Sequence, residues 1–221
     1  RKVVSPMHYK FTKMLKASRH ITRVNNEGLR KLKKLLSLFL SLLLVITPSF
    51  SVSASADRTS SPMIRYLDVT RQQQQKSEWC WAACSSMVSE CLFSPYRTQA
   101  DIVRHVKGSS TIDDGATTTE LEEALDYALF GNYDVSCTFR ATYEFLAEKI
   151  YIDGKPLIFW INWNSGGAHA VVASGCNAIT TTFKIVDPWY GCGTSLYPYS
   201  AMLNGMTFES GTGKLAFFFY Y

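Results

Sequence analysis

An apolar run in the first quarter of the chain restricts its fold more than any other sequence feature. Residues 35–46 read LLSLFLSLLLVI, follow a cluster of lysine and arginine residues, and lead into PSFSVSASA, which ends at Ala56. Basic residues, an apolar segment of about a dozen residues and a small-x-small cleavage site are together typical of a secretory signal peptide. A membrane-spanning helix needs about 20 apolar residues, so a membrane anchor is the weaker interpretation. We expect residues 31–56 to be a signal peptide that is cleaved after Ala56.

This signal peptide divides the chain into three parts. Residues 1–30 are basic and have no periodic apolar face, so we expect them to be an upstream extension that is not part of the fold. Residues 57–221 are enough for one domain with a substantial hydrophobic core. We expect this domain to be secreted, to act outside the cell or in the cell envelope, and to have no stable membrane association after cleavage.

The charge of the chain changes sign when the targeting segment is removed. Eleven of the 23 Lys and Arg residues precede residue 57, but only one of the 18 acidic residues does. The remaining domain therefore carries 12 basic and 17 acidic side chains, a net charge of −5, against +5 for the whole chain. Without an excess of basic groups, the domain lacks the electrostatic attraction that nucleic-acid binding needs. We expect no nucleic-acid partner, no cofactor and a monomer.

All six cysteines lie within residues 57–221, where export permits disulfide bonds. A zinc site is the rival use for them. No pair has the C-x-x-C spacing, and only two histidines, His105 and His169, remain after cleavage. Zinc sites are built from four such ligands at close spacing, so we expect no metal site.

The secondary-structure signals change character halfway through the domain. Ser77 is a candidate N-cap for a buried helix over 79–92, and Thr117 and Glu120 form a capping box for another helix that ends before Gly131. Two more helices are expected over 98–108 and 144–154. The second half is rich in β-branched and aromatic residues, and strands are expected over 157–163, 168–175, 181–187 and 214–221. Helices followed by strands favour an α+β fold with an antiparallel sheet over alternating βαβ units.

One cysteine and one histidine are placed to work as a nucleophile and its base. Cys80 falls in the first turn of the expected 79–92 helix, where the helix dipole and a nearby imidazolium would favour the reactive thiolate. His105 lies beside charged neighbours in an amphipathic helix, as a solvated surface histidine would. His169 follows two glycines at the start of an apolar strand, so it is the better candidate for the base.

A catalytic imidazole also needs an acceptor to orient it, and an oxyanion needs donors. Asp187 ends the strand that would pair with the His169 strand, which would bring the two side chains to one end of the sheet. Asp153 and Glu209 are weaker alternatives. The backbone N–H of Cys80 could supply one oxyanion donor. An upstream glutamine could supply the other: Gln74 lies six residues before Cys80, and Gln73 and Gln75 remain open on physical grounds.

Together these residues resemble the papain-like cysteine peptidases. Gln74, the Cys80-Trp81-Ala82-Ala83 helix start, the His169 strand and the Asp187-Pro188-Trp189 segment occur in that family's order. The short W-C-W-A-A form resembles the compact bacterial members, namely effector peptidases of plant pathogens and bacteriocin-leader-processing peptidases. The resemblance implies a papain-like fold, with an N-terminal helical half that carries the nucleophile helix and packs on a C-terminal antiparallel sheet. It also implies a cysteine endopeptidase with a peptide or protein substrate, which the signal peptide predicts to be secreted.

The chain also departs from papain and the cathepsins. Their C-G-S-C-W segment has a cysteine where this chain has Ser77, so the disulfide of that cysteine is absent. Only 89 residues separate Cys80 from His169, against about 130–150 in papain and the cathepsins. The loops that shape their substrate cleft are therefore shortened, and substrate preference does not carry over.

Three interpretations remain open at this point. Cys84 is either a buried packing thiol or a bridge partner, and we expect Cys176 and Cys192, which flank the hairpin that bears Asp187, to form a disulfide. The chemistry could be a related thiol acyltransferase or amidase reaction on the same scaffold. The domain could also be a catalytically inactive papain-like binding module.

Overall fold

Residues 64–221 are described by the structure, which is a computed structural model. They lie within one compact unit, Arg58–Tyr221. The expected upstream extension and signal peptide, residues 1–56, lie outside the described residues and stay predictions. Within residues 64–221 there is no helix with the length and apolar character that crossing a bilayer would require.

Threonine side chains begin three of the helices. Thr98 and Thr117 each form a capping box with the acidic residue three positions on, and Thr142 accepts a hydrogen bond from a first-turn N–H. Gly108, in the left-handed region, ends the first of these helices. The predicted helices are thereby confirmed, with their ends shifted by a few residues. The helices are α2 (Cys80–Leu92), α3 (Gln99–Lys107), α4 (Thr118–Ala128), α5 (Tyr143–Tyr151) and α6 (Tyr199–Asn204).

The predicted N-cap of α2 is wrong. The helix begins at Cys80, and its N-cap position is Trp79, which makes no capping hydrogen bond through its side chain. Ser77 lies outside the helix and donates its hydroxyl proton to the carboxylate of Asp113 at 2.7 Å. A hydrogen bond to a carboxylate is charge-assisted and therefore stronger than the neutral bond of a helix cap. A long-range contact thus fixes the Ser77 side chain that the local pattern assigned to the cap.

The strands form one antiparallel sheet in the order β2-β8-β3-β4-β5-β6, with β1 paired to β4 and β7 to β8. The long strands match the predictions, whereas the shorter elements β2, β6, β7 and α6 were not predicted. Gly166 and Gly167 have positive φ in the turn that delivers β4, which explains both glycines before His169. The strands are β1 (Ile64–Tyr66), β2 (Ser136–Thr138), β3 (Leu157–Trp163), β4 (Ala168–Asn177), β5 (Thr182–Val186), β6 (Thr194–Pro198), β7 (Met206–Phe208) and β8 (Gly211–Tyr220).

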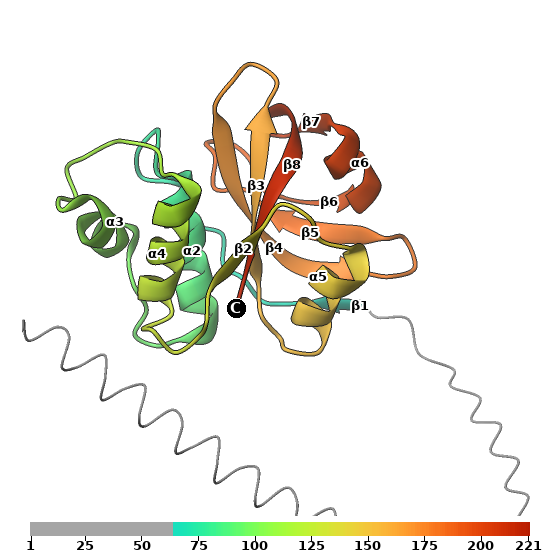
Figure 1. Ribbon diagram of the computed structural model, residues 1–221, viewed down its shortest axis with the longest axis horizontal. Coiled ribbons are helices and arrows are strands. Elements are labelled where there is room, and N and C mark those ends of the chain that lie inside the picture. The colour runs from blue at the N-terminus through green and yellow to red at the C-terminus, as the bar shows by residue number, and fades with distance from the viewer. Residues whose placement is uncertain (1–63) are drawn as a thin grey trace, which may run out of the picture. The chain divides into compact units, whose positions relative to one another are not determined.

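Helices cover both faces of this sheet. In Figure 1, α2, α3 and α4 group on one side of it, while α5 and α6 lie beside the strands on the other. Adjacent residues of the central strands alternate between the two sides. Ile158 and Val172 belong to the hydrophobic core between the sheet and α2. Phe159 and Val171 belong to the core between the sheet and helices α5 and α6. The predicted α+β fold, with an N-terminal helical half that packs on an antiparallel sheet, is confirmed.

The expected Cys176–Cys192 disulfide is wrong. All six cysteines of the described residues are free thiols. Cys176 pairs with Phe183 near one end of β5, whereas Cys192 belongs to the loop beyond the other end. Strand residues rise by about 3.3 Å each, so the length of β5 separates the two cysteines by well over the roughly 7 Å that a disulfide can bridge. Cys84 is fully buried in α2 as a packing thiol.

Candidate active site

Two tryptophans fix the start of the helix that carries Cys80. Trp79 and Trp81 are almost fully buried, while Cys80 between them is partly exposed. The indole N–H of Trp79 donates to the carbonyl of Ile112 at 2.8 Å, and that of Trp81 donates to the carbonyl of Asp114 at 3.1 Å. Both rings are therefore tied to one loop. The W-C-W pattern holds the thiol at a defined place on the surface.

The same loop positions the residues just before α2, and it does so through Asp113. The Asp113 carboxylate accepts from the Ser77 hydroxyl at 2.7 Å and from the Glu78 backbone N–H at 2.9 Å. Since no side chain caps α2, its first-turn N–H groups retain a partial positive charge at the end of the helix where Cys80 lies. Sequence reasoning missed Asp113, because nothing in the local pattern pairs it with a residue 36 positions away.

His169 lies between two aromatic rings at the start of β4. It is 2 % exposed and pairs across the sheet with Ile161 of β3. The Trp163 ring stacks on the imidazole with centroids 5.5 Å apart, and the Trp189 ring meets it edge-on at 5.9 Å. Water has little access to this imidazole, so its polar contacts are made with protein groups.

The side chain of Asp187 bonds directly to His169. Nε2 of His169 lies 2.8 Å from Oδ1 of Asp187, at the end of β5 where the hairpin prediction put it. An ionised carboxylate only accepts, so Nε2 carries the proton and Nδ1 is the nitrogen left for Cys80. Oδ1 also accepts from the backbone N–H of Trp189 at 2.9 Å, and Oδ2 accepts from the hydroxyl of Ser210 at 2.6 Å.

The pair shifts both pKa values in the direction of an ion pair. Burial lowers the pKa of His169, but hydrogen bonds to Asp187 and Cys80 and their charges outweigh it and raise that pKa to about 9. Burial likewise favours neutral Asp187, yet the hydrogen bond and charge of His169 and the bonds from Ser210 and Trp189 hold the pKa of Asp187 below its usual value. At neutral pH the site therefore contains an imidazolium and a carboxylate.

The loop that follows Asp187 is tied to the segment before α2. Arg71 donates through Nε to the carbonyl of Asp187 at 2.7 Å and through Nη2 to the carbonyl of Trp189. The backbone N–H of Gln74 donates to the carbonyl of Pro188, between them, at 2.9 Å. The three consecutive carbonyls of residues 187–189 therefore all accept hydrogen bonds from residues 71–74. These contacts join the two segments that carry Gln74 and Asp187.

Gln74 is the glutamine that the structure places beside the start of α2. It is fully buried, whereas Gln73 and Gln75 are exposed. Its Nε2 donates to the carbonyls of Lys76 at 2.9 Å and Ser77 at 2.6 Å, and its Oε1 has no partner among residues 64–221. An amide nitrogen has two N–H groups, so donation to an oxyanion would require Gln74 to give up one of these contacts.

The alternative residues from the sequence do not join the site. The Asp153 carboxylate forms an ion pair with Lys149 of α5 at 3.4 Å. The His105 ring stacks on Tyr127 of α4. Glu209 lies near the site but accepts from the Asp187 loop and from β6 rather than from the imidazole. In the described part of the chain, no three His, Cys, Asp or Glu side chains are grouped as metal ligands.

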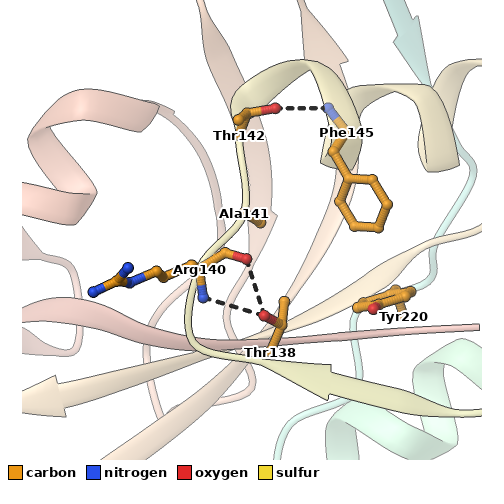
Figure 2. Close-up of a pocket in the computed structure, with 6 residues that line it drawn as sticks. All are labelled: Thr138, Arg140, Ala141, Thr142, Phe145 and Tyr220. Atoms are coloured by element: carbon orange, nitrogen blue, oxygen red, sulfur yellow. Dashed lines mark hydrogen bonds between the residues drawn. The ribbon is translucent and has the colours of Figure 1, made fainter.

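A surface pocket of about 380 Å³ lies elsewhere, between β2, the start of α5 and the end of β8. In Figure 2 the ring of Phe145 stands beside that of Tyr220, and the Thr138 hydroxyl bonds to the backbone of Arg140. Cys80, His169, Asp187 and Gln74 are not among its lining residues, so the pocket is separate from the candidate active site. The lining residues are Thr138, Arg140, Ala141, Thr142, Phe145 and Tyr220.

Comparisons with known proteins find similarity over much of the chain. The family described as papain-like cysteine protease AvrRpt2 matches residues 63–202, which is more than half of the chain. A solved structure that is similar is the peptidase domain of Streptococcus ComA, a bifunctional ABC transporter involved in a quorum-sensing pathway. It is 18 % identical, with a TM-score of 0.48, and the match covers 69 % of this chain and 98 % of that one. A comparison with curated proteins finds no match.

Proposed function

The chain belongs to the family of papain-like cysteine proteases named for AvrRpt2, a family of cysteine-type peptidases, and from this we propose how it cleaves peptide bonds. Cys80 is the nucleophile, His169 the general base and acid, and Asp187 the residue that orients His169. Gln74 and the backbone N–H of Cys80 stabilise the oxyanion. The observation that carries the proposal is the buried His169–Asp187 pair, whose free ring nitrogen serves the thiol at the start of α2.

In the first half of the reaction the peptide is cleaved and its acyl part stays on the enzyme. The Cys80 thiolate attacks the scissile carbonyl carbon, and the carbonyl electron pair moves onto oxygen. The resulting oxyanion is held by N–H donors at the start of α2 and by Gln74. When the C–N bond breaks, the imidazolium of His169 gives its proton to the leaving nitrogen. The amine product departs, and a thioester remains on Cys80.

In the second half water removes the acyl group. Neutral His169 accepts a proton from a water molecule, whose oxygen attacks the thioester carbonyl. The C–S bond then breaks, the acid product leaves, and the thiolate–imidazolium pair is restored. Asp187 remains ionised throughout, because it stabilises the imidazolium without taking its proton.

The pH dependence of wild type should report on His169. We expect kcat/KM to fall as the pH rises through about 9, because the imidazolium that protonates the leaving nitrogen is lost there. The contact with Asp187 raises this pKa against the effect of burial, so Asp187→Ala should move the alkaline limb to lower pH. Initial rates with a quenched fluorescent peptide over a pH series measure the alkaline limb of wild type and that of the variant. If the limb stays in place in the variant, Asp187 does not orient His169.

Gln74 can be tested against its own neighbour. Gln74→Ala is expected to lower kcat by roughly 100-fold, the usual cost of removing one oxyanion donor. Gln73→Ala changes the same side chain at an exposed position and should leave kcat unchanged within about twofold. The measurement is steady-state kinetics of both variants on one peptide, with thermal unfolding to check the fold. Equal kinetics for the two variants would remove Gln74 from the mechanism.

We also propose that the peptidase is exported and acts as a monomer on peptides or proteins outside the cytoplasm. Support comes from the sequence of residues 31–56 and from the net charge of −5 that remains after Ala56. The N-terminal sequence of the protein recovered from a secreting host tests this. Cleavage after Ala56 is the expected result, and recovery of the uncleaved chain in the cytoplasm would overturn the proposal.

A further inference from the structure

Ser210 contacts the site from a distant part of the chain. It lies in the short turn between β7 and β8, and its hydroxyl donates to Oδ2 of Asp187 at 2.6 Å. The other carboxylate oxygen, Oδ1, already accepts from the His169 ring and from the Trp189 backbone. Among residues 64–221, Ser210 is the partner of Oδ2. Both oxygens of the Asp187 carboxylate therefore accept hydrogen bonds. The donors come from β4, from the loop after Asp187 and from the β7–β8 turn.

The neighbouring residue, Glu209, is the one that anchors this turn. Its carboxylate accepts from the backbone N–H of Gly193 at 2.7 Å and from the hydroxyl of Ser195. These contacts attach the β7–β8 turn to the Asp187 loop and to β6. The hydroxyl of Ser210 is not needed for that attachment, and it is directed at Asp187 instead.

A carboxylate held through one oxygen can still rotate about its Cβ–Cγ bond and turn its other oxygen toward a neighbour. A donor on the second oxygen opposes this rotation and also stabilises the charged form of the acid. Ser210 supplies that donor to Asp187. The plane of the carboxylate then fixes the direction in which the His169 ring lies, and with it the direction of Nδ1.

We propose that Ser210 is a positioning residue of the active site, which acts on His169 through Asp187 and does not touch the substrate. This inference rests on the proposed function, because it requires Asp187 to orient His169. Loss of the Ser210 hydroxyl should therefore lower kcat and leave KM unchanged. It should have no effect once Asp187 has been removed.

Two variants of equal shape isolate the hydroxyl. Ser210→Thr keeps the donor and Ser210→Val removes it, so any cost of a larger side chain is common to both. We expect kcat of Ser210→Val to be about three- to tenfold below that of Ser210→Thr, with KM equal within about twofold. The loss of a whole hydrogen bond to a charged group would cost more than this, but Ser210 acts on the reaction only through Asp187. Alkylation of Cys80 by iodoacetamide, followed by mass spectrometry, should slow by a similar factor without any need for a peptide substrate.

A control from the same hairpin separates this role from a structural one. The Thr212 hydroxyl pairs with that of Thr207 across β7 and β8 at 3.0 Å, so Thr212→Val removes a hydroxyl that does not reach Asp187. We expect its kcat and alkylation rate to match wild type. If Thr212→Val lowers both as much as Ser210→Val does, the effect is one of hairpin packing and the inference is wrong.

The double variant with Asp187→Ala decides how Ser210 acts. In the Asp187→Ala background, Ser210→Val and Ser210→Thr should have equal rates, because the hydroxyl has lost its partner. Independent, additive losses would overturn the inference. If Asp187→Ala alone is as active as wild type, the proposed triad fails. If Asp187→Ala is impaired but Ser210→Val is not, only the inference about Ser210 fails.

Discussion

Replacement of Cys80 by alanine is expected to lower kcat/KM for peptide hydrolysis by at least about 10⁴-fold, because the acyl intermediate has no other atom to form on. The structure gives this thiol a place that no other cysteine shares. It is partly exposed at the uncapped end of α2 and contacts a histidine that is charged at neutral pH. A broad peptide library, digested with wild type and with the variant, measures the loss whatever sequence the enzyme prefers.

Cys84→Ala is the matched control for this experiment. Cys84 lies one helical turn after Cys80, is fully buried, and has a pKa raised well above its usual value by burial and by the charges of Cys80 and Asp187. As a neutral packing thiol, it should contribute about 1 kcal/mol to stability and little to catalysis. We expect Cys84→Ala to retain kcat/KM within a few fold. Equal cleavage of the library by Cys80→Ala and wild type would show that the nucleophile is wrongly assigned.

His169→Ala is expected to cost nearly as much as Cys80→Ala. The imidazolium supports the thiolate and protonates the leaving nitrogen, so both residues act as one unit and their losses should not add. The variant with both residues changed should therefore be no slower than Cys80→Ala alone. These rates are measured on the peptide that wild type cleaves best in the library.

His105→Ala is the control for the histidine. Its ring is exposed on α3 and stacks on Tyr127 at 4.0 Å, away from the catalytic residues. We expect kcat/KM to stay within about twofold of wild type, as for most surface substitutions. If His105→Ala and His169→Ala lose activity equally, or if neither does, the base has been wrongly assigned.

Much of the site could be predicted because short-range patterns specify it. The capping boxes at Thr98 and Thr117 fix α3 and α4 from neighbouring residues alone. The apolar strands on either side of a short turn indicate a β4–β5 hairpin, and this hairpin brings Asp187 to the same end of the sheet as His169. Both cases depend on residues close together in sequence, for which local propensities are informative.

The rest depends on contacts between residues far apart in sequence. Ser210 meets Asp187 across 23 positions and Arg71 meets it across 116, and neither residue stands out in its own surroundings. The same reason explains the two wrong predictions. Ser77 is drawn to Asp113 on a distant loop, and the spacing of Cys176 and Cys192 in the sequence does not show that β5 holds them apart. Such contacts follow from the assembled fold and leave no periodic signal.

The most direct test of the account compares the alkylation rates of Cys80 and Cys192 by iodoacetamide at mildly acidic pH. Burial and the charges of Asp187 and Glu209 raise the pKa of Cys192 to about 11 even though Arg71 opposes them, so that thiol should stay protonated and unreactive. The account predicts that Cys80 is labelled far faster than Cys192 in wild type, and that this advantage disappears in His169→Ala. Labelling of Cys80 no faster than Cys192 in wild type, or an advantage that survives without His169, would contradict it.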